Sequence, residues 1–240
     1  MHIHIRNQMN KQKIVIAIDG HSSCGKSTVA KDLAKALSIA YVDTGAMYRS
    51  VTLYALRHNL ISNNIVNEAE LIKALPNIKI TFAFNAAQKK NETFLNGESV
   101  EAEIRQMEVS SHVSLVSTIG AVRRQLVEWQ REMGKEGSLV IDGRDIGTVV
   151  FPHADLKIFM TASDEVRAQR RYEELLSKDQ QANFAEVLHN VQERDRIDST
   201  RTESPLRKAD DALLLDNSNM TMAEQFDWIM QQLRNKKLID

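Results

Sequence analysis

Residues 20–27 read Gly20-His21-Ser22-Ser23-Cys24-Gly25-Lys26-Ser27 and fit the pattern G-x-x-x-x-G-K-[ST]. The apolar run 14–18 precedes them, and Val29, Leu33 and Leu37 follow at the spacing of an amphipathic helix. A strand, a glycine-rich loop and a helix in this order surround phosphate groups with backbone N–H groups. The stretch therefore predicts a phosphate-binding loop, and a chance glycine- and serine-rich turn is the less favoured alternative.

The residue types of this loop suit a nucleoside triphosphate. Gly20 and Gly25 permit the tight turn that brings the backbone close to the phosphates. Lys26 supplies a positive charge between the β- and γ-phosphates, and Ser27 can reach a magnesium ion directly or through water. The residues that we expect to contact ATP are Gly20, His21, Ser22, Ser23, Cys24, Gly25, Lys26, Ser27 and Thr28.

Two loop residues allow a further reading. A helix N-terminus lowers the pKa of a thiol, so Cys24 could be a reactive thiolate, although a small side chain that fills the loop is favoured. His21 could act as a base, but no partner in the sequence orients it, and a histidine on the loop surface is favoured.

A carboxylate follows the apolar segment 138–141. Asp142 has the position of an acid that holds magnesium-bound water next to such a loop. Aspartate after a buried strand is also a common turn or helix-cap residue. With the loop present, we expect Ser27 and Asp142 to hold Mg²⁺, directly or through water.

The rest of the chain alternates between strand and helix patterns. Apolar runs typical of buried parallel strands span residues 14–18, 39–42, 139–141, 156–160 and 213–215. Helical stripes lie between or after them, at residues 46–58, 122–133 and 222–233. This order predicts an α/β fold of the P-loop NTPase type, with a five-stranded parallel sheet flanked by helices.

Two segments interrupt this order. Residues 78–82 alternate with period two, and residues 93–95 precede the turn pair Asn96-Gly97, so we expect an antiparallel insertion over 60–104. Residues 163–200 are charged and rich in arginine, with a polar break at 178–181, and we expect a mobile helical lid there. The P-loop core then spans 12–240, after a flexible N-terminus at 1–11.

Composition limits the partners and the compartment. The chain has 240 residues, of which 31 are basic and 32 acidic, so no global charge favours nucleic acid or an anionic membrane. No apolar run approaches the length of a membrane span, and residues 1–10 lack the apolar stretch of a signal peptide. A single cysteine cannot form an internal disulfide. We therefore expect a cytoplasmic protein.

The longer motifs are more specific. They are DTGAMYR (43–49), EIRQMEVS (103–110), DGRDIGTVVFP (142–152), RAQRR (167–171) and ERDRIDSTR (193–201). With these motifs, residues 13–236 closely resemble the bacterial cytidylate kinases of the nucleoside monophosphate kinase family. The resemblance implies a monomer that uses ATP and Mg²⁺ to convert CMP and dCMP into CDP and dCDP by direct in-line phosphoryl transfer. It also implies that the 60–104 insertion lies on the acceptor side.

The resemblance also implies roles for single residues. Those expected to hold the acceptor phosphate are Thr44, Arg49, Arg144 and Arg201. Those expected to line the ribose are Tyr48, Arg194 and Asp198. Those expected to read cytosine are Ser114, Arg123 and Asp145. Those expected to stabilise the transferring phosphoryl group are Lys26, Arg144, Arg167, Arg170, Arg171 and Arg201.

Helical spacing agrees with part of this assignment. A helix would present Arg194, Asp198 and Arg201 on one face, and likewise the trio Arg167, Arg170 and Arg171. The alternative for each trio is a solvated face with ordinary salt bridges.

The chain departs from the family pattern at three positions. Ser23 stands where glycine is common, Thr44 where serine is common, and Ile197 where a further arginine is common. Thr44 keeps the hydroxyl, and Arg196 is a candidate to replace the missing arginine.

Two other functions remain open at the level of sequence. One is a P-loop kinase for another acceptor, such as UMP or a non-nucleotide metabolite. The other is a non-catalytic nucleotide-binding switch, although residues 235–238 lack the aspartate of the guanine-reading N-K-x-D motif.

Overall fold

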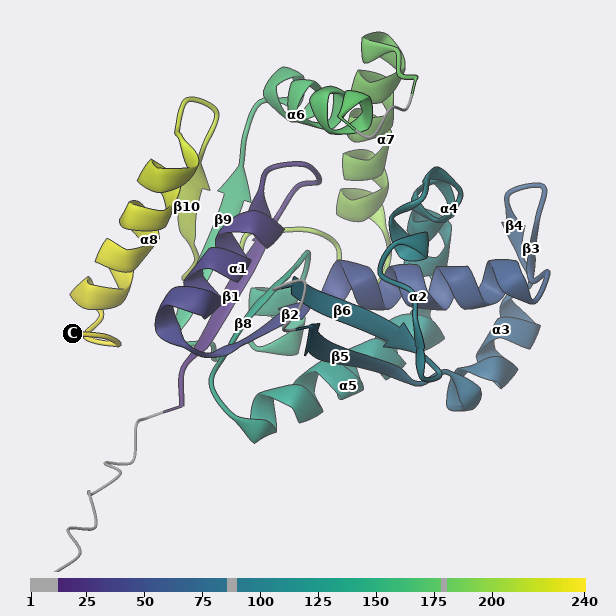
Figure 1. The fold of residues 1–240 in the computed structure, drawn as a ribbon, viewed down its shortest axis with the longest axis horizontal. Coiled ribbons are helices and arrows are strands. Elements are labelled where there is room, and N and C mark those ends of the chain that lie inside the picture. The colour runs from purple at the N-terminus through teal and green to yellow at the C-terminus, as the bar shows by residue number, and fades with distance from the viewer. Residues whose placement is uncertain (1–12, 86–89, 178–180) are drawn as a thin grey trace, which may run out of the picture.

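The computed structural model describes residues 13–85, 90–177 and 181–240. The predicted N-terminal segment 1–11, residue 12 and most of the predicted polar break at 178–181 lie outside the described residues. The described part is an α/β fold built on one parallel sheet, with further elements inserted between its strands (Figure 1).

The central sheet contains the predicted strands. They are β1 (Val15–Gly20), β2 (Ala40–Asp43), β8 (Leu139–Gly143), β9 (Leu156–Thr161) and β10 (Leu213–Asp216). The order across the five-stranded sheet is β10-β9-β1-β8-β2, and every pair is parallel. β1 is central, so the loop that follows it lies in the middle of the sheet's carboxyl edge.

Helices cover both faces of the sheet, which is why its strands read as continuous apolar runs. On one face, α1 (Lys26–Leu37) and α8 (Met222–Asn235) pack with Ile16 and Ile18 of β1. On the other face, α2 (Thr44–Arg57) and α5 (Gly120–Glu136) pack with Ala17. The sheet and these helices therefore form the three-layer core that the sequence predicts.

The antiparallel insertion is confirmed, and it contains more than strands. It comprises β3 (Ile61–Ser62), β4 (Ile65–Val66), α3 (Glu68–Ala74), η1 (Leu75–Asn77), β5 (Ile80–Asn85), β6 (Lys90–Leu95), β7 (Glu98–Ser99) and η2 (Glu103–Arg105). Helix α3 was not predicted, because it is short and Leu71 is its one buried residue. In Figure 1, α3 and the β3–β4 pair lie on the opposite side of the molecule from α8.

A helix also follows the insertion where none was predicted. α4 (Met107–Ser117) buries Val109, Val113 and Val116, whose spacing is that of a helix face. This stripe within residues 103–117 was the available signal for the helix.

Two helices follow β9 and pack against each other. α6 (Asp164–Leu176) and α7 (Phe184–Thr200) share a small apolar core that contains Ala168, Leu175 and Val187. Their arrangement agrees with the prediction of two helical stretches in this region. One detail was wrong, because α7 ends at Thr200 and Arg201 is the residue after the helix.

Among the described helices, none is long and apolar enough to cross a bilayer.

Candidate active site

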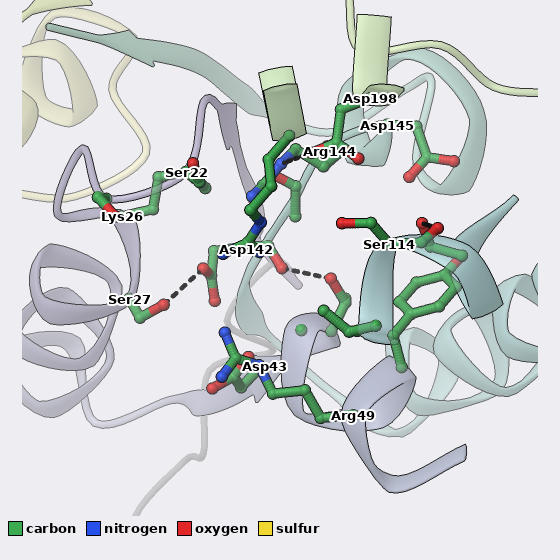
Figure 2. Close-up of a pocket in the computed structure, with 18 of the residues that line it drawn as sticks. Ser22, Lys26, Ser27, Asp43, Arg49, Ser114, Asp142, Arg144, Asp145 and Asp198 are labelled. Carbon is green, nitrogen blue, oxygen red and sulfur yellow. Dashed lines mark hydrogen bonds and ion pairs between the residues drawn. The ribbon is translucent and has the colours of Figure 1, made fainter. Parts of the chain in front are cut away.

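A cavity of about 360 Å³ lies at the carboxyl edge of the central sheet. This volume is in the range of small-molecule sites. Its walls come from the loop after β1, from α2, α4 and α5, from the segment after β8, and from α6 and α7. Figure 2 shows Lys26 and Ser27 on one side of this cavity, with Ser114 and Asp145 on the opposite side.

The loop after β1 has the backbone that phosphate binding requires. Gly20 and Gly25 have φ angles of 146° and 88°, in the region that favours glycine. Lys26 begins α1, is 5% exposed, and donates from Nζ to the carbonyl of His21 at 2.5 Å. Burial lowers the pKa of Lys26, and the nearby Arg144 acts in the same direction. The lysine is therefore held over the loop, within an electropositive cavity.

Gly20 has no room for a side chain. A Cβ at this position would lie 2.0 Å from the carbonyl oxygen of Met160. We expect Gly20→Ala to lower the free energy of unfolding by about 3 kcal/mol, since it adds an overpacked contact to a strained φ angle. Gly97→Ala is the matched control, because Gly97 has a φ of 86° and, apart from its chain neighbours, no atom of the described residues lies within 4 Å of its Cβ position. The control substitution should lower the free energy of unfolding by about 1 kcal/mol. Equal losses in urea denaturation would contradict the steric argument.

The structure separates the alternatives for Cys24 and His21. Cys24 is fully buried and its Sγ donates to the carbonyl of His21 at 3.0 Å, as expected of a residue that fills the loop. His21 is not isolated on the loop surface, because its Nδ1 lies 3.4 Å from Oδ1 of Asp195 on α7. Neither side chain lines the cavity.

Ser27 and Asp142 come together although they are far apart in the chain. The Ser27 hydroxyl donates to Oδ2 of Asp142 at 2.9 Å, and the Tyr41 hydroxyl donates to Oδ1 at 2.8 Å (Figure 2 shows the first bond). Burial and the charge of Asp43 raise the pKa of Asp142 to about 6. The Ser27 hydroxyl at the start of α1 and the Asp142 carboxylate of β8 together form an oxygen donor set of the kind that Mg²⁺ prefers.

Cationic side chains crowd the far half of the cavity. Arg49, Arg144, Arg194 and Arg201 all line it. Burial lowers the pKa of Arg49 to about 9, and Arg194 and Arg105 add to this effect. The Nε of Arg194 and the Nη2 of Arg201 are buried without a hydrogen-bond partner among the described residues. Buried unsatisfied donors of one sign favour an anionic ligand.

Asp198 organises two of these arginines. One carboxylate oxygen accepts from Nε of Arg144 at 2.8 Å, and the other accepts from Nη1 of Arg201 at 3.2 Å. Burial acts to raise the pKa of Asp198, but the two arginines outweigh it and hold the pKa below its usual value. Thr44 lines the same cavity, is buried and donates from Oγ1 to the carbonyl of Asp142 at 2.7 Å.

A buried ion pair lines the end of the cavity opposite Lys26 and Ser27, where Figure 2 shows Asp145. Nη2 of Arg123 lies 2.5 Å from Oδ2 of Asp145, and the two side chains are 2% and 7% exposed. The Tyr48 ring lies against the guanidinium of Arg123, at 5.4 Å from its centroid. Ser114 of α4 lines the same end. This end therefore offers a carboxylate acceptor, a guanidinium donor and a hydroxyl within a small space.

Comparison with known proteins identifies the family. The cytidylate kinase family model matches residues 16–235. This chain belongs to the cytidylate kinase family. It is 59% identical to a cytidylate kinase of Parabacteroides distasonis over 221 residues. These aligned residues cover 92% of this chain and 96% of the relative. It is 56% identical to a cytidylate kinase of Phocaeicola vulgatus, over 93% of this chain and 97% of the relative.

A similarity to a solved structure supports the fold alone. An uncharacterised protein from Eubacterium ventriosum superposes with a TM-score of 0.50 at 12% identity, over 93% of this chain and 99% of that protein. The cytidylate kinase family membership thus rests on sequence, and the similarity to this structure concerns the overall fold.

The arginines of α6 do not all reach the site of this cytidylate kinase family member. Arg171 lines the cavity and pairs with Glu174 at 2.8 Å. Arg167 is 2% exposed and is held by Asp164, by Asp195 at 2.5 Å and by the Ser22 carbonyl at 3.3 Å. It therefore lies on a buried face and not on a solvated one.

Arg170 also lies outside the cavity lining. Its Nη1 donates to Oδ1 of Asn217 at 3.0 Å, and its Nη2 donates to the Asn217 carbonyl at 2.9 Å. Arg196, the candidate to replace the arginine missing at Ile197, pairs with Glu193 at 2.7 Å on the exposed side of α7. Of the predicted α6 trio, Arg171 alone lines the cavity, whereas Arg167 contacts the phosphate-binding loop through the Ser22 carbonyl.

Among the lining residues of this cytidylate kinase family site that sequence reasoning missed are two that form an ion pair with each other, Arg105 and Asp43. Arg105 of η2 lines the cavity and donates to Asp43 at 2.8 Å and to Glu101 at 2.9 Å. Asp43 ends β2 and also accepts from the backbone N–H of Ala46, at 2.9 Å. Arg105 lies in the motif at 103–110 and Asp43 in the motif at 43–49, so these two motifs were the available signal for both residues.

Proposed function

We propose that this chain transfers the γ-phosphoryl group of ATP to CMP and dCMP and releases ADP with CDP or dCDP. The observation that carries this proposal is the arrangement of the cavity. A phosphate-binding loop faces a cluster of partly unsatisfied arginines, and the buried Arg123–Asp145 pair lies beyond that cluster. Membership of the cytidylate kinase family supports the same reaction.

The ATP side consists of the loop and its helix start. We assign the triphosphate to residues 20–28, with Lys26 neutralising charge between the β- and γ-phosphates. Ser27 and Asp142 would hold Mg²⁺, directly or through water, because their oxygens lie together at this edge. When bound, Mg²⁺ supplies charge neutralisation at the phosphate oxygens.

The acceptor phosphate belongs on the arginine side. Arg49, Arg144 and Arg201 converge there, and Thr44 adds a hydroxyl. Arg105, paired with Asp43 at the same wall, is a further candidate for the phosphate. Tyr48, Arg194 and Asp198 are placed in this proposal along the ribose. The Nε of Arg194 and the Nη2 of Arg201 would gain the hydrogen bonds that they lack.

Base selection follows from the donor and acceptor pattern. Cytosine offers an N4 amino group to Asp145 and the N3 and O2 acceptors to Arg123, with Ser114 alongside. Uracil reverses this pattern at positions 3 and 4, so each side chain would face a like partner. A site built of buried hydrogen-bonding groups rejects such a mismatch strongly.

The reaction needs positioning more than proton transfer. An acceptor phosphate oxygen is already anionic near neutral pH, so it can attack in line without a general base. Lys26, Arg144, Arg171 and Arg201 line the route of the transferred group in this proposal. Arg167 and Arg170 would join them only by leaving their partners Asp195 and Asn217.

Water must be excluded during transfer, or ATP would be hydrolysed. We assign this closure to two segments inserted in the 12–240 core: residues 60–104 on the acceptor side and the lid at about 163–200. The proposal also includes a monomer that acts in the cytoplasm without nucleic-acid or membrane partners, in keeping with its 31 basic and 32 acidic residues.

The proposal is tested by ADP release with CMP, dCMP, UMP and AMP compared side by side. We expect high turnover with CMP and dCMP, with UMP and AMP lower by about a hundredfold or more in kcat/KM. Preference for UMP or AMP would assign the chain to another acceptor. ATP binding without acceptor-dependent ADP release would show a nucleotide-binding switch.

A further inference from the structure

Asp19 lies at the end of β1, one residue before the phosphate-binding loop, and is 5% exposed. Its Oδ1 accepts from the backbone N–H of Ile146 at 2.7 Å, and its Oδ2 accepts from that of Gly147 at 2.7 Å. Both donors belong to the short helical turn η3 (Ile146–Val150), which directly follows Asp145. The carboxylate of β1 therefore caps a turn that is more than 120 positions away in sequence.

Because Asp19 caps η3, the Asp145 carboxylate is not needed as a cap for that turn. An aspartate at the residue before a helical turn ordinarily accepts hydrogen bonds from the first free N–H groups of that turn. Asp145 holds this position, yet within the described part of the chain its carboxylate makes no such capping bond. It bonds Nη2 of Arg123 instead, at 2.5 Å. Because Asp19 satisfies the turn, the Asp145 carboxylate is free to face the cavity.

The fit around Asp19 is close. In the sheet, Asp19 pairs in register with Gly143, the residue that leads into Arg144 and Asp145. A Cβ on Gly147 would lie 3.3 Å from Oδ2 of Asp19 and 3.1 Å from Cδ of Lys157, so a side chain at position 147 would crowd the carboxylate. Burial raises the pKa of Asp19 to about 6, while the two backbone hydrogen bonds act to lower it. The group is therefore mainly a charged acceptor at neutral pH.

We propose that Asp19 is a positioning residue for acceptor selectivity: by capping the turn after Asp145, it keeps the Asp145 carboxylate directed at Arg123 and at the acceptor base. This inference rests on the proposed cytosine-reading function of that pair. Asp19 also precedes Gly20 directly, so one residue connects the donor loop with the base-reading turn. It touches neither substrate in this proposal.

The variant Asp19→Asn tests the role. Asparagine has nearly the same shape but presents an NH₂ group to one of the two backbone N–H donors. We expect KM for CMP to rise and the CMP-to-UMP ratio of kcat/KM to fall, each about tenfold, because a small displacement of a reading group is costly. KM for ATP should stay within about twofold, since Asp19 does not cap the loop helix.

Asp155→Asn is the matched control. Asp155 also accepts a backbone hydrogen bond from β1, at Val15 N and 2.8 Å, but at the far end of the strand from the cavity. The Asp155→Asn variant should leave the CMP-to-UMP ratio of kcat/KM unchanged. If Asp19→Asn lowers kcat/KM for both acceptors equally, or if both variants change the ratio alike, the role in selectivity is overturned.

A double-mutant cycle separates action through Asp145 from a general loss of structure. In an Asp145→Asn background, Asp19→Asn should change the CMP-to-UMP ratio less than about twofold, because the group that it positions is already altered. Additive effects would contradict the proposal. For a variant that fails to fold, hydrogen exchange on the wild-type protein remains decisive: the Ile146 and Gly147 amides should exchange slowly, and rapid exchange would refute the cap.

These outcomes are distinct from a failure of the proposed function. The wild-type acceptor panel decides whether the chain prefers CMP, without reference to Asp19. Slow exchange at Ile146 and Gly147 in a protein that does not prefer CMP would leave the cap intact and reject its role in selectivity. A CMP preference that survives Asp19→Asn would reject the positioning role alone.

Discussion

Lys26→Met is expected to lower kcat for CMP phosphorylation by about 10²- to 10³-fold, the usual loss when a single preorganised charge at the reacting group is removed. Lys26 starts α1 at the cavity wall, and its Nζ is already held by the His21 carbonyl. Methionine fills similar volume without charge, so the loop should keep its shape. The measurement is a coupled assay of ADP release at saturating CMP and ATP.

Lys35→Met is the matched control for this prediction. It makes the same substitution on the same helix, but Lys35 is exposed in the last turn of α1, away from the cavity lining. The control should keep wild-type turnover. Unchanged turnover in Lys26→Met, with its unfolding midpoint near that of wild type, would rule out the assigned role of the lysine.

Asp145→Ala is expected to reduce kcat/KM for CMP by about a hundredfold while reducing that for UMP much less. The reason is that Asp145 would accept from the N4 amino group of cytosine, which uracil lacks. The side chain is buried against Arg123, so its removal also leaves an uncompensated charge. This should lower the free energy of unfolding by about 3 kcal/mol. Initial rates with both acceptors and urea denaturation measure the two effects separately.

Asp145→Asn separates base reading from stability. The asparagine carbonyl still accepts one hydrogen bond, so the CMP-to-UMP ratio should fall less than in Asp145→Ala. Asp211→Ala is a second comparison, because it removes a carboxylate that pairs with the buried Lys157 outside the cavity. An equal loss for CMP and UMP in Asp145→Ala would argue against direct reading of the base by this residue.

The departures from the family pattern have different consequences in the structure. Thr44 keeps the hydroxyl at the cavity wall and uses it on the Asp142 carbonyl. Ser23 adopts a φ of 58°, a left-handed conformation that glycine enters more easily. Arg196 does not take the place of the arginine expected at position 197, because it pairs with Glu193 outside the cavity. Arg105 is a lining arginine that the prediction omitted.

The parallel sheet, its flanking helices and the phosphate-binding loop were all predictable from the amino-acid sequence. Each depends on local order: apolar runs of strand length, helical stripes, and glycines at the two tight positions of one loop. The antiparallel insertion was also predictable from its period-two pattern and from the Asn96-Gly97 turn. Helix α3 was not, because it is short and buries only Leu71.

Which charged side chains contact one another could not be predicted, because it depends on how the elements pack in three dimensions. Asp142 reaches Ser27 across 115 positions, Arg144 reaches Asp198 across 54, and Asp19 caps the turn after Asp145 across 127. Spacing on one helix suggested that Arg167, Arg170 and Arg171 act together, yet only Arg171 lines the cavity. Arg167 pairs with Asp195 on α7 and with the Ser22 carbonyl of the loop, and Arg170 pairs with Asn217 after β10. An arginine side chain is long and has several donors, so its partner depends on strand order and helix packing rather than on its neighbours in the chain.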